Sequence, residues 1–131
     1  MDGKHMSILI VDDTDFDRNL LRSILLAAGY EIVGLATCGE EGIQKYHTLK
    51  SDLVMLDLIM PDLNGIEVLR RIKIDNPDAK VMMCTSVGEE SMVDLARRMG
   101  ARGYVVKPYI AENLLSAVRK IIGLPAKKKS E

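Results

Sequence analysis

Three carboxylates, a hydroxyl and a lysine stand where short apolar runs of this sequence end. With the preceding runs in parentheses, they are Asp12 and Asp13 (residues 8–11), Asp57 (53–56), Thr85 (81–84) and Lys107 (104–106). Apolar runs of this length, bounded by polar residues, are typical of strands in a parallel sheet that is buried on both faces. Since parallel strands end at the same edge, we expect the five polar side chains to converge on one crevice.

This set of side chains suits phosphoryl transfer. Clustered carboxylates are the hard oxygen ligands that Mg²⁺ takes together with a phosphate. Lys107 can neutralise a phosphoryl oxygen and Thr85 can donate a hydrogen bond to another, which are the main requirements of the reaction. Asp57 stands alone at its strand end and is the best candidate for a nucleophile that forms an acyl phosphate, whereas the adjacent Asp12 and Asp13 are better arranged to share a cation. Taken alone, the acidic pair would more often be the acid-rich start of a helix than a metal site.

Segments of helical period alternate with the apolar runs and predict an α/β fold of five strands and five helices without a linker. Thr14 and Asp17 predict a capping box for the first helix, Gly29 its end, and residues 31–36 the second strand. The apolar residues expected on the buried faces of the helices are Phe16, Leu20, Leu21, Ile24, Leu25, Ala28, Ile66, Leu69, Leu95, Met99, Leu114, Leu115, Val118, Ile121 and Ile122.

Composition indicates one globular domain with locally recognised partners. The chain has 131 residues, is 47% hydrophobic and carries 18 basic against 19 acidic side chains, so no overall charge favours nucleic acid or membrane. The first residues contain no apolar signal core, and we expect a cytoplasmic protein in which Cys38 and Cys84 stay reduced. We expect a disordered start over residues 1–6, one domain over 7–122 and a flexible basic tail over 123–131.

Five motifs carry a family resemblance. They are VDD at residues 11–13, Asp57 with MP at 60–61, NG at 64–65, TS at 85–86, and YVVKP at 104–108. In type, order and spacing they resemble the receiver domains of two-component response regulators, in particular the single-domain, CheY-like receivers of chemotaxis. The resemblance implies a flavodoxin-like, doubly wound, five-stranded parallel sheet of order 2-1-3-4-5 with five helices.

The same resemblance assigns roles at the site. Asp57 would accept a phosphoryl group from a phosphohistidine of a sensor histidine kinase. Asp12, Asp13, Asp57 and the backbone carbonyl of Ile59 would arrange Mg²⁺, and Lys107 would bind a phosphoryl oxygen. The implied protein is a signalling module and not an enzyme, although it catalyses its own phosphorylation and slow dephosphorylation.

The resemblance also implies a switch and an output surface. Thr85 and the Tyr104 ring would report phosphorylation. We expect a monomer whose signal leaves by contact with an effector, such as a flagellar or motility switch component, with no role for nucleic acid or membrane. The expected effector face comprises Met92, Arg97, Arg98, Arg102, Tyr104 and Arg119.

Two other functions use similar residues. A phosphorelay intermediate would pass the phosphoryl group on to a histidine phosphotransfer protein. A haloacid-dehalogenase-type phosphatase would also use a nucleophilic aspartate with Mg²⁺, but it needs a second aspartate two positions later, where this chain has Ile59.

Three positions depart from the common receiver pattern. Ser86 adds a hydroxyl where a small residue is usual, although strand alternation should direct it away from Thr85. Ile59 and Val87 are apolar where relatives often carry polar groups. Because neither can orient a water molecule near the phosphorus, we expect slow loss of the phosphoryl group.

Overall fold

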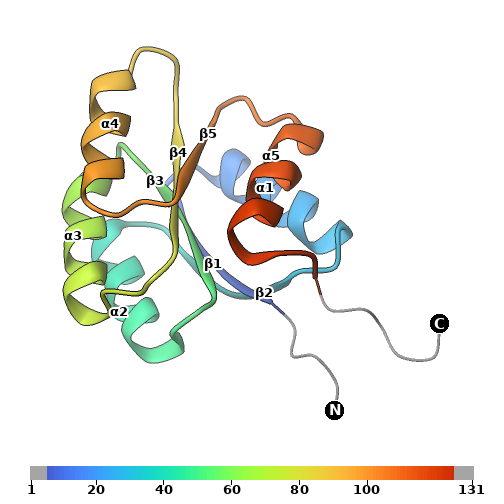
Figure 1. Ribbon diagram of the computed structural model, residues 1–131, viewed down its shortest axis with the longest axis horizontal. Helices are drawn as coiled ribbons and strands as arrows, with labels where there is room; N and C mark the ends of the chain where they lie inside the picture. Colours follow the sequence, from blue (N-terminus) through green and yellow to red (C-terminus); the bar gives the residue numbers. More distant parts are fainter. Residues whose placement is uncertain (1–5, 126–131) are drawn as a thin grey trace.

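The computed structural model describes residues 6–125, which form a five-stranded sheet flanked by five helices (Figure 1). All neighbouring strands are parallel, and their order is β2-β1-β3-β4-β5, so the predicted α/β fold and strand order are confirmed. In chain order the elements are β1 (Ser7–Val11), α1 (Asp15–Ala27), β2 (Glu31–Ala36), α2 (Gly39–Leu49), β3 (Leu53–Asp57), α3 (Gly65–Asp75), β4 (Val81–Thr85), α4 (Glu90–Arg98), β5 (Gly103–Val106) and α5 (Ala111–Ile122).

Helices cover both faces of the sheet, with α2, α3 and α4 on one side and α1 and α5 on the other (Figure 1). Side chains alternate between the two faces of each strand and form two separate hydrophobic cores. Leu9 and Val11 pack with the α2–α4 layer, while Ile8 and Ile10 pack with the α1–α5 layer. Burial on both faces explains why these strands are continuously apolar. The alternation extends to the strand ends and sets the side on which each polar residue emerges.

Three helical expectations were wrong. Thr14 is the N-cap residue of α1, but its side chain makes no capping hydrogen bond, so the predicted capping box is absent. Phe16, also expected on the buried face of α1, is 73% exposed. In α4 the buried positions are Val93 and Ala96, and Leu95 is 45% exposed.

The described ends of the chain are tied to the domain. The carbonyl of Met6 accepts a hydrogen bond from the Glu31 amide (3.0 Å), and the carbonyl of Gly123 accepts one from the Tyr30 hydroxyl (2.7 Å). Order therefore extends to both of these positions, which were expected to lie in the disordered start and in the tail. The rest of those expectations, including the lysine run at 127–129, falls on residues 1–5 and 126–131, outside the described part.

Both cysteines are free, as expected. Burial raises the pKa of the Cys84 thiol to about 12, which keeps it protonated and unreactive. Across residues 6–125, none of the helices has the length and apolar character needed to cross a membrane.

Candidate functional site

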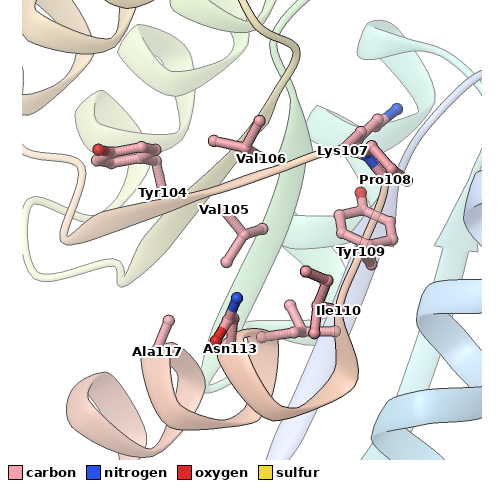
Figure 2. Close-up of a pocket in the computed structure, with 10 residues that line it drawn as sticks. Tyr104, Val105, Val106, Lys107, Pro108, Tyr109, Ile110, Asn113 and Ala117 are labelled. Carbon is pink, nitrogen blue, oxygen red and sulfur yellow. The ribbon is translucent and has the colours of Figure 1, made fainter.

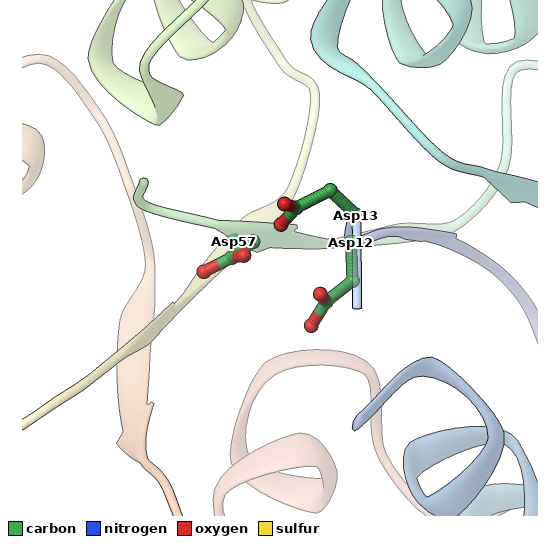
Figure 3. A group of neighbouring side chains, drawn as sticks. All are labelled: Asp12, Asp13 and Asp57. Carbon is green, nitrogen blue, oxygen red and sulfur yellow. The ribbon is translucent and has the colours of Figure 1, made fainter. Parts of the chain in front are cut away.

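The sheet brings the three predicted aspartates together. Strand β1 pairs with β3 so that Val11 lies opposite Leu56, and the next residues, Asp12 and Asp57, therefore emerge side by side. One carboxylate oxygen from each of Asp12, Asp13 and Asp57 lies within 4.8 Å of the others (Figure 3). Asp12 and Asp57 are only 1% and 7% exposed, whereas Asp13 faces solvent.

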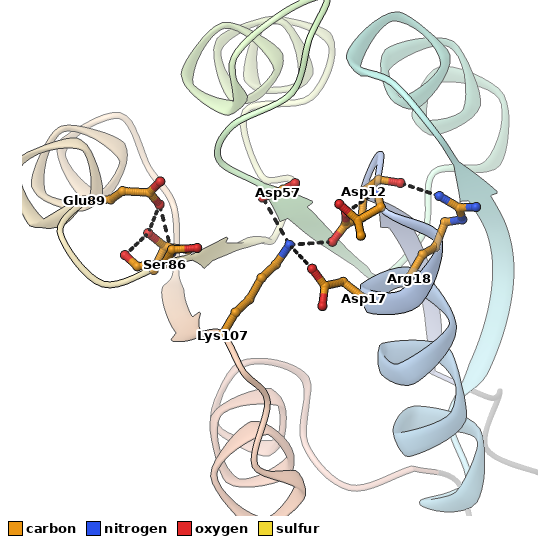
Figure 4. A network of polar contacts seen from close by, with 9 residues as sticks. Asp12, Asp17, Arg18, Asp57, Ser86, Glu89 and Lys107 are labelled. Atoms are coloured by element: carbon orange, nitrogen blue, oxygen red, sulfur yellow. Dashed lines mark hydrogen bonds and ion pairs between the residues drawn. The ribbon is translucent and has the colours of Figure 1, made fainter.

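Lys107 reaches this cluster from the end of β5. Its Nζ donates to Asp12 Oδ2 (2.9 Å) and Asp17 Oδ2 (3.0 Å) and lies 3.5 Å from Asp57 Oδ1 (Figure 4). The Lys107 amide donates to the Thr85 carbonyl (2.7 Å), and the peptide bond to Pro108 is cis. The hydrogen bond to Thr85 fixes where the lysine leaves the sheet, while its ammonium is surrounded by carboxylates.

The electrostatics of the cluster follow from burial and crowding. Burial, together with the negative charge of Asp12, raises the pKa of Asp57 to about 7, although Lys107 opposes the shift. Burial alone would lower the pKa of Lys107, but its hydrogen bonds to Asp12 and Asp17 and the charge of Asp57 raise it above the usual value. Repulsion among the aspartates therefore exceeds what one ammonium neutralises, and a bound cation would relieve it.

Two residues at the start of α1 take part in the site without having been predicted to do so. Asp17, expected in a capping box, instead pairs with Lys107, and Arg18 donates from Nη1 to the Asp12 carbonyl (2.7 Å). The Thr14 amide donates to Asp12 Oδ1 (2.9 Å), which anchors the turn between β1 and α1. The sequence carried no local signal for the Asp17–Lys107 pair, because the two partners lie 90 residues apart.

Thr85 lies on the other side of the sheet from Lys107. Its hydroxyl donates to the Glu89 carboxylate, which also accepts from the Ser86 amide (2.8 Å; Figure 4). Thr85 is 3% exposed, so this contact is largely screened from water. Glu89 is the third contributor that sequence reasoning missed, because it lies in the loop before α4, where no periodic pattern predicts which way a side chain points.

The loop after β3 borders the cluster. Asn64 caps α3 by accepting from the Glu67 amide (3.0 Å), and Asp62 accepts from the Gly39 amide (2.9 Å) and from the next amide in the first turn of α2. These backbone hydrogen bonds lower the pKa of Asp62 to about 2. Gly65 is required, since a Cβ there would lie 2.6 Å from a β3 carbonyl oxygen. The NG motif is therefore structural.

The apolar positions expected near the pocket, Ile59 and Val87, are 50% and 83% exposed. They follow β3 and β4 at the carboxyl edge of the sheet, two residues after Asp57 and Thr85 respectively. Their side chains are therefore accessible to water and to a docking partner.

Tyr104 lies on the edge strand and is 42% exposed, with the Arg97 guanidinium 5.5 Å from its ring centre. In Figure 2, Val105 points toward α5, while Tyr104 and Val106 extend to the opposite side of β5. The hollow on the α5 side of this strand, which also reaches Tyr109, has a volume of about 450 Å³.

Three residues of the expected effector face lie together beside β5. A hollow of about 350 Å³ between β5 and α5 brings Arg97 and Arg102 beside Tyr104, and the cation that α5 adds there is Lys120. Of the other three residues, Met92 packs against the core, Arg98 faces solvent and Arg119 lies beside the Tyr30 hydroxyl. The effector face itself stays a prediction.

Comparison with known proteins decides the family. The family model for the response regulator receiver domain matches residues 8–119 of this chain. The chain belongs to the response regulator receiver domain family. The receiver is 40% identical to the chemotaxis protein CheY of Thermotoga maritima, over 87% of this chain and 95% of that protein. It is 39% identical to the chemotaxis protein CheY of Bacillus subtilis, over 88% and 96%.

Solved structures agree. The CheX-CheY-BeF₃-Mg²⁺ complex from Borrelia burgdorferi matches with a TM-score of 0.84 and 34% identity, over 89% of each chain. The response regulator domain of Thermotoga maritima CheB matches with a TM-score of 0.85 and 32% identity, over 92% of this chain and 98% of that one. This receiver is therefore a CheY-like signalling module of the two-component system.

The residues of this receiver fit a magnesium ion. Three carboxylates from two adjacent strand ends form the donor set, and open space beside the exposed Asp13 leaves room for water ligands. Burial and then the negative charge of Asp12 raise the pKa of Asp57, and a bound cation would oppose both effects.

Proposed function

We propose that this receiver is a phosphorylation-activated response regulator that takes its phosphoryl group from a sensor histidine kinase on Asp57 and acts in chemotaxis or motility signalling. The observation that carries the proposal is the buried Asp57 carboxylate, with a lysine ammonium 3.5 Å away and two further carboxylates beside it. Resemblance to chemotaxis relatives supports the signalling context.

In the proposed reaction an Asp57 oxygen attacks the phosphorus of a phosphohistidine. The new P–O bond gives an acyl phosphate, the P–N bond breaks, and its electron pair returns to the imidazole nitrogen. Mg²⁺, held by Asp12, Asp13, Asp57 and the Ile59 carbonyl, would supply positive charge to the phosphoryl oxygens.

The chain's own groups orient and stabilise the product. Lys107, already in the cluster, can turn one N–H toward a phosphoryl oxygen, and Thr85 can do so once its hydroxyl leaves Glu89. Movement of Thr85 would vacate space on the side of β5 where Tyr104 lies, which couples the site to the surface around Arg97. The two forms must pre-exist in equilibrium, so a partner that prefers one form also alters phosphoryl turnover.

Labelling with acetyl phosphate and Mg²⁺ tests the chemistry. We expect one phosphoryl group per chain, no label in Asp57→Asn, and unchanged labelling in Asp78→Asn, which removes a carboxylate from the exposed loop before β4. Acid-stable label, or label that maps to another residue, would contradict the proposal.

Two further measurements test the output. Beryllofluoride should shift the amide NMR signals around Tyr104, and Thr85→Ala should reduce those shifts while leaving labelling of Asp57 intact. Rapid transfer of the label to a histidine phosphotransfer domain, without phosphorylation-dependent binding of a motility protein, would favour the phosphorelay alternative.

A further inference from the structure

Lys107 is shared among three carboxylates before any phosphoryl group arrives. Its ammonium donates to Asp12 and Asp17 at 2.9 and 3.0 Å, and its 3.5 Å approach to Asp57 is that of an ion pair (Figure 4). An ammonium has three N–H donors. A phosphoryl oxygen on Asp57 must therefore share Lys107 with carboxylates that already hold two of its donors.

Asp17 is the one of these carboxylates that the proposed chemistry does not use. Asp57 is the acceptor and Asp12 is a proposed metal ligand, while Asp17 is the third residue of α1 and reaches Lys107 across 90 residues of sequence. The pair is well shielded, because the side chains of Lys107 and Asp17 are only 14% and 23% exposed. An ion pair shielded to this degree is stronger than one on the open surface.

A structural role for Asp17 has little support. The box that it would have closed with Thr14 is absent, and its neighbour Arg18 is directed to the Asp12 carbonyl and the Asp15 carboxylate. What remains for Asp17 as a helix residue is an acid near the N-terminus of α1, which is a modest stabilising contribution that Asp15 also makes.

We propose that Asp17 is a positioning residue that holds Lys107 toward α1 in the unphosphorylated receiver and competes with the phosphoryl group for it. This inference rests on the proposed function of Asp57. The Asp17 carboxylate also adds a negative charge next to the site where the phosphoryl charge develops. Both effects disfavour the phosphorylated state, so Asp17 sets the affinity of the receiver for its own phosphoryl group below the value that the rest of the site would allow.

Beryllofluoride, which binds an aspartate carboxylate as a phosphoryl stand-in, provides the test. Calorimetric titration in saturating Mg²⁺ should give a Kd about two- to fivefold lower for Asp17→Asn than for the unchanged protein, as expected for removal of one partly shielded charge pair. Asparagine keeps the size and the acceptor oxygen of Asp17, which preserves packing. Damage to the fold would weaken binding, so a gain in affinity separates positioning from a structural role.

Asp15→Asn is the matched control, because it removes the same charge from α1 at a side chain that is 86% exposed and pairs with Arg18. It should leave the Kd unchanged, and thermal unfolding should confirm that both variants fold. An equal gain in both variants, or no gain in Asp17→Asn while Asp57→Asn abolishes binding, would overturn the inference alone. Binding retained by Asp57→Asn would overturn the proposed function and the inference with it.

Discussion

Replacement of Asp57 by asparagine should stabilise the metal-free receiver at neutral and alkaline pH. Burial and the charge of Asp12, partly opposed by Lys107, raise the pKa of Asp57 from 3.8 to about 7. The folded protein therefore binds this proton more tightly than the unfolded chain does. Below the pKa of the unfolded chain, Asp57 does not reduce the free energy of unfolding. The free energy of unfolding falls as the pH rises from this pKa to that of the folded protein, and above the folded pKa the full reduction is present.

The size of the effect follows from the shift. About three pKa units at about 1.4 kcal/mol each give an upper bound of about 4 kcal/mol for holding Asp57 ionised in the folded state. Water can enter at the sheet edge beside Asp13 and relieve part of this penalty. We therefore expect Asp57→Asn to gain about 2 kcal/mol of unfolding free energy above pH ~7.

Urea unfolding of both proteins in the presence of a chelator measures this difference. It should be close to zero near pH ~4, grow through the interval, and level off above pH ~7. Asp15→Asn controls for the simple loss of one negative charge. A difference that stays constant with pH, or that favours the aspartate as pH rises, would refute the reasoning that burial and crowding dominate at this carboxyl.

Four further substitutions have measurable consequences. Asp13→Asn should weaken Mg²⁺ binding by about tenfold or more, measured by calorimetry, because a ligand is lost; unchanged affinity would move the metal site elsewhere. Glu89→Gln should cost about 1 kcal/mol in urea unfolding, since the carboxylate loses charge-assisted bonds from the Thr85 hydroxyl and the following amide, and a double-mutant cycle with Thr85→Val should show coupling. Gly65→Ala should destabilise by about 2 kcal/mol in the same assay, because its methyl group would lie 2.6 Å from a β3 carbonyl oxygen; normal stability would show that the loop yields freely. Ile59→Asn should speed loss of label from the phosphorylated receiver after the donor is removed, and an unchanged rate would show that this position does not control water access.

The strand-end residues were predictable because a parallel sheet reduces their placement to one rule. Once residues 8–11 and 53–56 are read as neighbouring strands, Asp12 and Asp57 must emerge at the same edge. Strand alternation also predicts that the side chains of Lys107 and Thr85 lie on opposite faces of the sheet.

Contacts made by helix and loop residues were harder to predict from the sequence. The partner of Asp17 is 90 positions away and depends on the phase of α1 relative to the sheet, which a local capping pattern misrepresented. Phe16 and Leu95 follow the apolar period of their helices, but a period says which side is apolar and not how far the sheet extends beneath it. Glu89 lies in a loop, where side-chain direction depends on tertiary contacts.

The two groups proposed to bind phosphoryl oxygens are anchored in different layers of the molecule. Lys107 is bonded to Asp17 on α1, and Thr85 to Glu89, the N-cap residue of α4 on the other side of the sheet. A phosphoryl group that draws Lys107 from Asp17 and Thr85 from Glu89 would loosen both anchors at once, one on each side of the sheet. Hydrogen exchange at the start of α1 and in the loop before α4 would then increase together on phosphorylation.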